Sequence, residues 1–210
     1  MAEQGLNPIL EGKPPYPLLV VISGPSGVGK DTLLMRMREL GFPFHFVVTA
    51  TSRPIRPGER DGFDYHFVTK SHFEQMIERE ELLEFADVYG HYKGIPKSEV
   101  RQALDSGKDV ILRIDVQGAA TIRRLAPGAL FIFVAPGSFD ELRWRLQLRR
   151  SESEDEVERR LSFARQEMEQ ARQFDYLVIN HENHLDEAVG KIRAIIVAEK
   201  QRVHARRVTL

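Results

Sequence analysis

The residues with the clearest chemical purpose form a glycine-rich turn near the start of the sequence. Gly24, Gly27 and Gly29 precede Lys30 at the spacing of a phosphate-binding P-loop. In such a loop, main-chain N–H groups surround a phosphate and the lysine reaches its outer oxygens. Asp31 stands at the last position, where the motif has a serine or threonine that holds Mg²⁺. The turn therefore predicts a nucleotide phosphate site.

The segments on either side distinguish this site from a plain glycine-rich connection. The apolar run 18–22 predicts a strand that is buried on both faces. A helical face of apolar residues follows the lysine: Leu33, Leu34, Met37 and Leu40. A buried strand before the turn and an amphipathic helix after it are the context that the motif requires, and the helix N-terminus favours an anion. Phosphate binding is therefore the favoured interpretation.

A second candidate anion site lies in the loop 49–65, which is rich in proline and glycine. Arg53 and Arg56 place two guanidinium groups three residues apart, and such groups grip a phosphate in a bidentate manner. Tyr65 adds a hydroxyl at the end of the loop. Solvated surface arginines are the alternative, but a second anion site near a P-loop is what a phosphoryl transferase needs. The loop therefore predicts a binding site for the phosphate acceptor.

Two carboxylates occupy positions where they could contact a ligand. Glu84 has apolar neighbours, and a carboxylate that is partly removed from water needs hydrogen-bond donors, which a guanine N1–H and amino group would supply. A solvent-facing strand position is the alternative for Glu84. Asp115 ends an expected strand at 109–115, at the edge where open α/β sheets bind ligands. Asp115 is a candidate for contact with Mg²⁺ or substrate, and a helix cap is the alternative.

An arginine-rich pair of helices is expected after residue 137. Ser138 and Glu141 form a capping box that opens a helix, in which Arg145 and Arg149 share one face. A second charged segment carries Arg160. The pair shows few apolar residues, which is typical of a mobile lid. A solvated helix pair is the alternative.

The remaining segments alternate apolar strands with amphipathic helices. Further strands are expected at 44–48, 130–134 and 176–180, and helices at 97–104, 117–125 and 185–196. Between them, a capping box at Ser71 and Glu74 predicts a helix that begins at His72, followed by a hairpin over 82–94. Residues 1–16 are expected to form a flexible extension, and residues 202–207 a solvated basic tail.

The overall composition narrows the class of protein. The chain has 210 residues and a formal net charge of −1, so no global field attracts nucleic acid or an anionic membrane. It has no cysteine, which excludes disulfides and thiolate metal sites and fits a reducing compartment. No apolar run approaches the roughly 20 residues of a membrane span, and the N-terminus does not resemble a signal peptide. We expect a cytoplasmic protein without nucleic-acid or membrane partners.

The motifs occur together in an order that closely resembles the guanylate kinase family. The resemblance covers about residues 17–202 and rests on the P-loop, the loop 52–59 with Asp64 and Tyr65, the segment 114–118 and the arginine-rich lid. It implies transfer of the γ-phosphoryl group of ATP to GMP, giving GDP and ADP, with Mg²⁺, in purine nucleotide metabolism and GMP recycling. Protein partners are not implied.

The resemblance also implies roles for individual residues. The implied donor-binding residues are Gly24, Pro25, Ser26, Gly27, Val28, Gly29, Lys30, Asp31 and, near adenine, Asn180. The GMP phosphate would be held by Arg53, Arg56, Tyr65 and Lys93, and the guanine by Thr49, Glu84 and Asp115. The implied catalytic residues are Lys30, Arg53, Arg145, Arg149 and Arg160.

The implied fold is the α/β P-loop NTPase fold. It has three layers around a five-stranded parallel core sheet, with an inserted α+β lobe for the nucleoside monophosphate and a helical lid. In this chain the expected guanylate kinase-like domain covers residues 17–210. Its expected parts are a core at 17–48, 97–136 and 166–204, a GMP-binding lobe at 49–96 and a lid at 137–165.

Three residues depart from the family pattern. Asp31 replaces the P-loop hydroxyl, Lys93 replaces a tyrosine and Arg113 replaces an acid. Lys93 still offers a donor to phosphate, and the other two changes look like an exchange of one carboxylate for another. We expect Asp31 to meet Mg²⁺, directly or through water, or to pair with Arg113. These departures also resemble the organelle-type branch of the family and related bacterial members.

Two other functions are compatible with the same motifs. A non-catalytic guanylate kinase-like interaction module is the first, although such modules usually lose P-loop features that this chain keeps. A kinase for another nucleoside monophosphate is the second, and Thr49, Glu84 and Asp115 favour guanine only through matching positions.

Overall fold

The computed structural model describes residues 16–88, 90–148 and 154–208. Its central element is a five-stranded sheet in which every neighbouring pair of strands is parallel. In spatial order the strands are β2 (Phe44–Phe46), β7 (Asp109–Arg113), β1 (Leu19–Ser23), β8 (Leu130–Pro136) and β9 (Tyr176–Asn180). The expected five-stranded parallel core sheet is therefore confirmed. The expected extension at 1–16 lies almost entirely outside the described residues.

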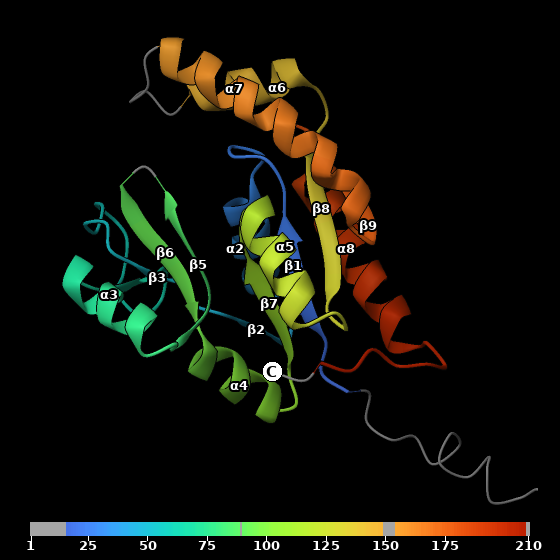
Figure 1. Cartoon of the computed structure of the whole chain (residues 1–210). Helices are drawn as coiled ribbons and strands as arrows, with labels where there is room; N and C mark the ends of the chain where they lie inside the picture. The colour runs from blue at the N-terminus through green and yellow to red at the C-terminus, as the bar shows by residue number, and fades with distance from the viewer. Residues whose placement is uncertain (1–15, 89, 149–153, 209–210) are drawn as a thin grey trace, which may run out of the picture.

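Helices cover both faces of this sheet (Figure 1). On one face, Val20 and Ile22 of β1 pack with α2 (Lys30–Glu39) and α8 (Leu185–Lys200). On the other face, Leu19 and Val21 pack with α4 (Lys97–Asp105) and α5 (Val116–Leu125). Alternate side chains of a strand point to opposite faces, so a strand covered on both sides must be apolar throughout. This explains the continuous apolar run before the glycine-rich turn.

A second sheet forms the small lobe, which we define as residues 50–96. Its strands are, in order, β4 (His66–Phe67), β3 (Ala50–Thr51), β6 (His91–Pro96) and β5 (Leu82–Val88). Helix α3 (Lys70–Glu78) packs on it, with Phe73 fully buried and stacked on Tyr92. The expected start of this helix was wrong by two residues, because the Thr69 hydroxyl, not Ser71, accepts the capping bond from the His72 amide. The lobe stands beside the main sheet (Figure 1).

The arginine-rich segment folds as two helices above the main sheet in Figure 1, α6 (Phe139–Gln147) and α7 (Glu154–Glu169), followed by the short 3₁₀ helix η1 (Gln170–Gln173). Ser138 caps α6 as expected. The pair is less polar than the sequence suggested, because it has a hydrophobic cluster of its own: Leu142, Leu146, Val157, Leu161 and Ala164. Helix α7 also continues four residues past the expected lid boundary at 165.

The basic C-terminal segment is largely exposed, as expected of a solvated tail, but Arg206 departs from that expectation. Arg206 donates to the buried Glu199 carboxylate at 2.7 Å and to the Ala129 carbonyl at 2.9 Å. The basic residues expected in water are therefore partly used to neutralise a carboxylate at the end of α8. Among the described residues, no helix is both long and apolar enough to cross a bilayer.

Candidate active site

The glycine-rich turn joins the end of β1 to the start of α2, and two of its glycines are required by close neighbours. Gly24 has φ +143°, and a Cβ there would lie 2.1 Å from the Val134 carbonyl oxygen on β8. Gly29 has φ +96°, and its Cβ would lie 2.7 Å from the Asn180 amide nitrogen. Any side chain at either position would push the turn away from the strands that support it. The turn is therefore fixed against the carboxyl ends of β8 and β9.

Lys30 folds back over the turn. Its Nζ donates to the Gly24 carbonyl at 2.5 Å and to the Pro25 carbonyl at 3.0 Å. Burial lowers the pKa of Lys30 to about 8, although the nearby carboxylates of Glu167 and Asp31 oppose this shift. A phosphate at the turn would add negative charge and favour the protonated amine. The predicted phosphate-binding lysine is thus placed at the turn.

Helix α7 reaches the turn with one cation and one anion. Arg160 donates to the Ser26 hydroxyl at 2.8 Å, and the Ser26 amide donates to Glu167 at 3.3 Å. Arg160 was predicted to lie near the phosphates, whereas Glu167 was not predicted as a site residue. The two residues are seven apart, two helical turns, and this spacing was the available signal that they share a face. The Glu167 carboxylate thus accepts a hydrogen bond from a main-chain amide of the kind that a P-loop uses to bind phosphate.

Arg145 and Asn180 support the turn from the other side. Arg145 donates to the carbonyls of Val28 at 3.0 Å and Asn180 at 2.9 Å, and to Glu182 at 2.9 Å. The buried Asn180 amide also donates to the Val28 carbonyl at 2.9 Å. The structure therefore places both predicted residues at the P-loop. Arg149, the other predicted lid arginine, lies outside the described residues.

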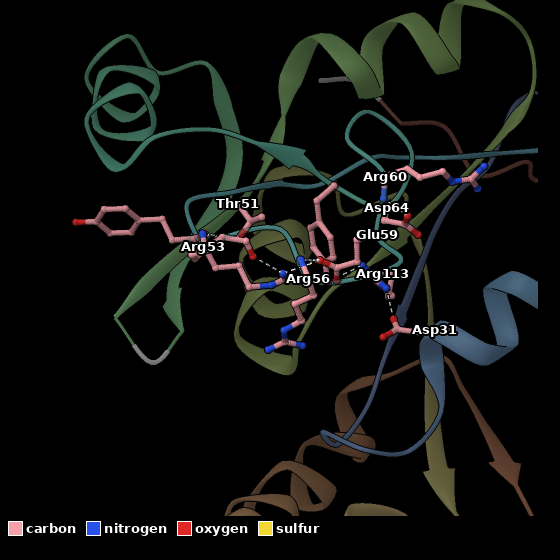
Figure 2. Close-up of polar contacts among 11 residues, drawn as sticks. Asp31, Thr51, Arg53, Arg56, Glu59, Arg60, Asp64 and Arg113 are labelled. Atoms are coloured by element: carbon pink, nitrogen blue, oxygen red, sulfur yellow. Dashed lines mark hydrogen bonds and ion pairs between the residues drawn. The ribbon is translucent and has the colours of Figure 1, made fainter. Parts of the chain in front are cut away.

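Arg53 and Arg56 lie in the small lobe, where Glu59 contacts the guanidinium group of Arg53 and the main-chain amide of Arg56. The Arg53 guanidinium pairs with both oxygens of Glu59, with Nη1 2.7 Å from Oε2, and stacks over the Tyr65 ring. The bond to Arg53 is the main reason why the pKa of Glu59 is lowered. The Arg56 side chain is exposed, and Figure 2 shows it projecting out of the loop. An internal carboxylate thus occupies the guanidinium fork predicted to bind phosphate.

Asp31, Arg113 and Tyr65 form a contiguous group between the turn and the small lobe. The Arg113 guanidinium forms an ion pair with Asp31 (Figure 2) and donates to the Tyr65 hydroxyl at 3.0 Å. Lys93 approaches the same tyrosine, with its Nζ 5.7 Å from the ring centroid. Of the partners predicted for Asp31, the structure shows Arg113, while the role of Asp31 in metal binding stays a prediction.

Glu84 is buried, with 8% of its surface exposed, which decides against a solvent-facing position. Burial, and secondarily the charge of Asp115, raise the pKa of Glu84 to about 7. Asp115 caps α5 by accepting from the Gly118 amide at 2.8 Å. A Cβ on Gly118 would lie 2.9 Å from the Glu84 carboxyl carbon, so this glycine lets the carboxylate approach α5.

Asp115 and Thr49, which were also predicted to lie around guanine, make hydrogen bonds within the protein. Asp115 has the alternative role of a helix cap, and its contact with substrate stays a prediction. Thr49 is half-buried, and its carbonyl accepts from the His66 amide at 2.9 Å. This bond joins Thr49 to β4 through the main chain and leaves the predicted contact of its side chain with guanine as a prediction.

Comparison with known proteins identifies the family. A family model described as guanylate kinase matches residues 16–199. A rice protein named guanylate kinase 2, chloroplastic/mitochondrial (Oryza sativa subsp. japonica) is 52% identical over 94% of this chain and 70% of its own length. A guanylate kinase from Desulfitobacterium hafniense is 45% identical over 89% of this chain and 92% of its own.

A solved structure agrees with the sequence relatives. The crystal structure of guanylate kinase from Anaplasma phagocytophilum matches with a TM-score of 0.72 and 28% identity, covering 90% of this chain and 89% of that one. The rice and bacterial matches fit the predicted resemblance to organelle-type and bacterial members. A match over nearly the whole described fold leaves no large part of the chain outside the comparison, and the chain belongs to the guanylate kinase family.

Proposed function

We propose that this protein transfers the γ-phosphoryl group of ATP to GMP, giving GDP and ADP. The observation that carries the proposal is the joining of two anion-binding segments by one side chain. Arg113 contacts Asp31, next to the P-loop lysine, and Tyr65, beside Arg53. A phosphate donor and a phosphate acceptor held by these segments would therefore be neighbours. Family membership supports the same activity.

On the donor side, the P-loop amides and Lys30 would bind the β- and γ-phosphates. Arg160 already contacts the turn through Ser26, and Arg145 through Val28, so α6 and α7 need only small movements to bring positive charge onto the phosphates. Arg149 is proposed to act with them. Asn180, beside the turn, is proposed to lie near the adenine.

On the acceptor side, the GMP phosphate would bind Arg53, Arg56, Tyr65 and Lys93. Glu59 now fills the fork of Arg53, so phosphate must displace this carboxylate or share the guanidinium with it. The buried carboxylate of Glu84 would accept hydrogen bonds from the guanine N1–H and amino group, assisted by Thr49 and Asp115.

Mg²⁺ fits the donor side, because the Asp31 side chain offers a hard oxygen ligand and is 63% exposed. When bound, Mg²⁺ supplies neutralisation of charge on the donor phosphates. Asp31 would hold it directly or through water, in exchange for or beside its contact with Arg113. Such a partly hydrated ion needs few protein ligands when phosphates provide the others.

For phosphoryl transfer, the protein must align the two substrates and neutralise charge on the transferred group. It does not need to form a covalent bond to that group. We assign no general base, because the phosphate of GMP is already ionised near neutral pH. The small lobe and the α6–α7 pair would exclude water, which otherwise accepts the phosphoryl group.

A coupled assay of ADP release with ATP and each of GMP, AMP, UMP and CMP tests this function. We expect turnover with GMP to exceed turnover with the others. Preference for another base would identify a different nucleoside monophosphate kinase, and no turnover with any of them would favour a binding module. Lys30→Met should abolish turnover, whereas Lys191→Met, at an exposed lysine of α8 paired with Glu187, should not.

We also propose a role in purine nucleotide metabolism and GMP recycling, and a cytoplasmic location. The absence of cysteine supports a reducing compartment. The name of the rice relative makes an organelle the alternative. Fractionation of source cells, with marker enzymes for each compartment, distinguishes the two locations.

A further inference from the structure

We propose that Arg113 is a positioning residue that couples the donor and acceptor phosphate sites. It does so by holding Asp31 at the start of α2 and Tyr65 in the small lobe with one guanidinium group. This inference rests on the proposed function, since it assigns the two sides of Arg113 to the two substrates. It adds a physical link between sites whose residues come from separate parts of the fold.

The main chain fixes Arg113 beside the P-loop. Arg113 is the last residue of β7, and it lies opposite Ile22 of β1 in the parallel register. The amide of the next residue, Ile114, donates to the Ile22 carbonyl at 3.3 Å. Because β1 leads directly into the glycine-rich turn, the main chain of Arg113 lies beside the phosphate site. Its pairing with β1 in the sheet fixes the position of the Arg113 Cα atom.

The side chain of Arg113 uses its two terminal nitrogens for different partners. Nη1 pairs with the carboxylate of Asp31, and Nη2 donates to the Tyr65 hydroxyl at 3.0 Å. The guanidinium carbon also lies 5.3 Å from the centre of the Tyr65 ring, within the range of a cation–π contact. Only 22% of the Arg113 side chain is exposed, whereas 63% of the Asp31 side chain is, so the contact with Tyr65 is better shielded from water than the contact with Asp31. Figure 2 shows Arg113 and Asp31 facing each other.

Arginine is suited to this place in a way that lysine is not. A planar guanidinium presents separate donors at fixed angles and can hold two partners at once, whereas a lysine ammonium acts as a single point charge. The positive charge of Arg113 also offsets the negative charge of the Asp31 carboxylate at the start of α2. An uncompensated guanidinium of Arg113 would be costly, because most of its side chain is removed from water.

The arrangement has a thermodynamic consequence. A phosphate that reorients Tyr65 changes the contacts of Arg113, and therefore the position of Asp31 next to the P-loop lysine. A donor that moves Asp31 acts on Tyr65 by the same route. Because coupling between binding sites is reciprocal, GMP and the ATP analogue must change each other's affinity by the same factor. Replacement of Arg113 is expected to reduce this change in affinity by the share of the coupling that Arg113 transmits.

A cycle of substitutions tests the coupling. Asp31→Ala and Tyr65→Phe are made singly and together, first with Arg113 present and then with Arg113→Met. For each variant, kcat, both KM values and the dissociation constants for GMP and a non-hydrolysable ATP analogue are measured. With Arg113 present, we expect the two changes to be non-additive by a factor between about 2 and about 150, the usual range for residues that share a partner. With Arg113→Met, they should become additive within about twofold.

Controls separate coupling from simple loss of fold. Thermal unfolding is followed for every variant, and Arg113→Lys is used if Arg113→Met does not fold, because it keeps the charge but cannot hold both partners. Arg36→Met is the matched control, since Arg36 lies on α2 but pairs with Asp186 at the surface. It should leave the non-additivity unchanged.

Two results would overturn the inference. One is additivity of Asp31→Ala and Tyr65→Phe with Arg113 present, and the other is non-additivity that persists in Arg113→Met. Either result, with the wild-type protein still phosphorylating GMP, rejects the coupling and leaves the proposed function standing. A wild-type protein without turnover on GMP would reject the function itself.

Discussion

Glu84 is a carboxylate that folding removes from water, with 8% of its surface exposed and α5 packed against it. Its pKa of about 7 has burial as the main cause and the charge of Asp115 as the second. A raised pKa means that the folded protein retains a proton on Glu84 that the unfolded chain releases above pH 4.5. The retained proton makes its full contribution to the stability of the folded state below pH 4.5. This contribution is lost as the pH rises through about 7.

The pKa of Glu84 predicts a pH dependence of GMP binding. Only the ionised carboxylate accepts both guanine donors, so GMP affinity should fall about tenfold between pH 8 and pH 6. Isothermal titration calorimetry at several pH values measures this change. Glu84→Gln is the matched control, because it keeps the shape and leaves only the titration of the GMP phosphate. Equal pH slopes in both proteins would contradict the prediction.

Single residues could be predicted where one segment carries the signal. Lys30 follows from the glycine spacing, and Arg53 from its place in a shaped loop. The pairing of Arg53 with Glu59 was not predicted, because an acid six residues away in a polar loop gives no sign of which cation it meets. Glu167 was missed for a related reason: its partner, the Ser26 amide, is 141 residues away.

Helix α7 illustrates how an element can serve two purposes. One face packs Val157, Leu161 and Ala164 into the cluster with α6. An adjacent face presents Arg160 and Glu167 to the glycine-rich turn. The position of α7 therefore determines both the integrity of the helix pair and the charge that the nucleotide site contains before ligand binds.

Replacement of the acid on α7 should strengthen nucleotide binding. Glu167→Gln removes the negative charge that attracts Lys30, and it replaces a charged acceptor of the Ser26 amide by a weaker, neutral one, so phosphate competes better for both groups. We expect a non-hydrolysable ATP analogue to bind about threefold to tenfold more tightly, as for one exchanged hydrogen bond of about 1 kcal/mol. Calorimetry measures the affinity, and Glu169→Gln, at an exposed position on the same helix, is the control. Weaker binding by Glu167→Gln would show that the acid supports the site instead.

Elements with one strong periodicity were predicted well. The strand 176–180 and the helix after the P-loop agree closely with β9 and α2. The helix cap at Ser71 was wrong because two capping-type residues, Thr69 and Ser71, lie two positions apart, and the His72 amide donates to the first of them. The lid cluster was underestimated because its five apolar residues are spread over two helices, and only their packing brings them together.

At the scale of the whole molecule, the small lobe and the α6–α7 pair lie on different sides of the P-loop region (Figure 1). Each has a hydrophobic cluster of its own, while Leu83 and Ile95 at the base of the small lobe belong to a cluster of the main sheet. Parts that are internally packed can move as units without unfolding. The fold class was accessible from sequence, but the relative placement of these units depends on long-range contacts that local patterns do not encode.

This organisation predicts closure when both substrates bind. A non-hydrolysable ATP analogue with GMP should reduce the radius of gyration by roughly 1 Å, from about 17 Å expected for a compact chain of this length. Small-angle X-ray scattering measures the change, with each ligand alone as a control for partial closure. Unchanged scattering at saturating concentrations of both ligands would argue for a preformed site.

Gly118 contributes no functional group, yet it sets the depth at which Glu84 can sit. One methyl group at this place would press on the acid and displace it from its position against α5. With Glu84 in its proposed contact with guanine, the ability to tell one nucleobase from another would depend on a hydrogen atom of Gly118. A survey of variants chosen only for polar side chains near the base would overlook this determinant.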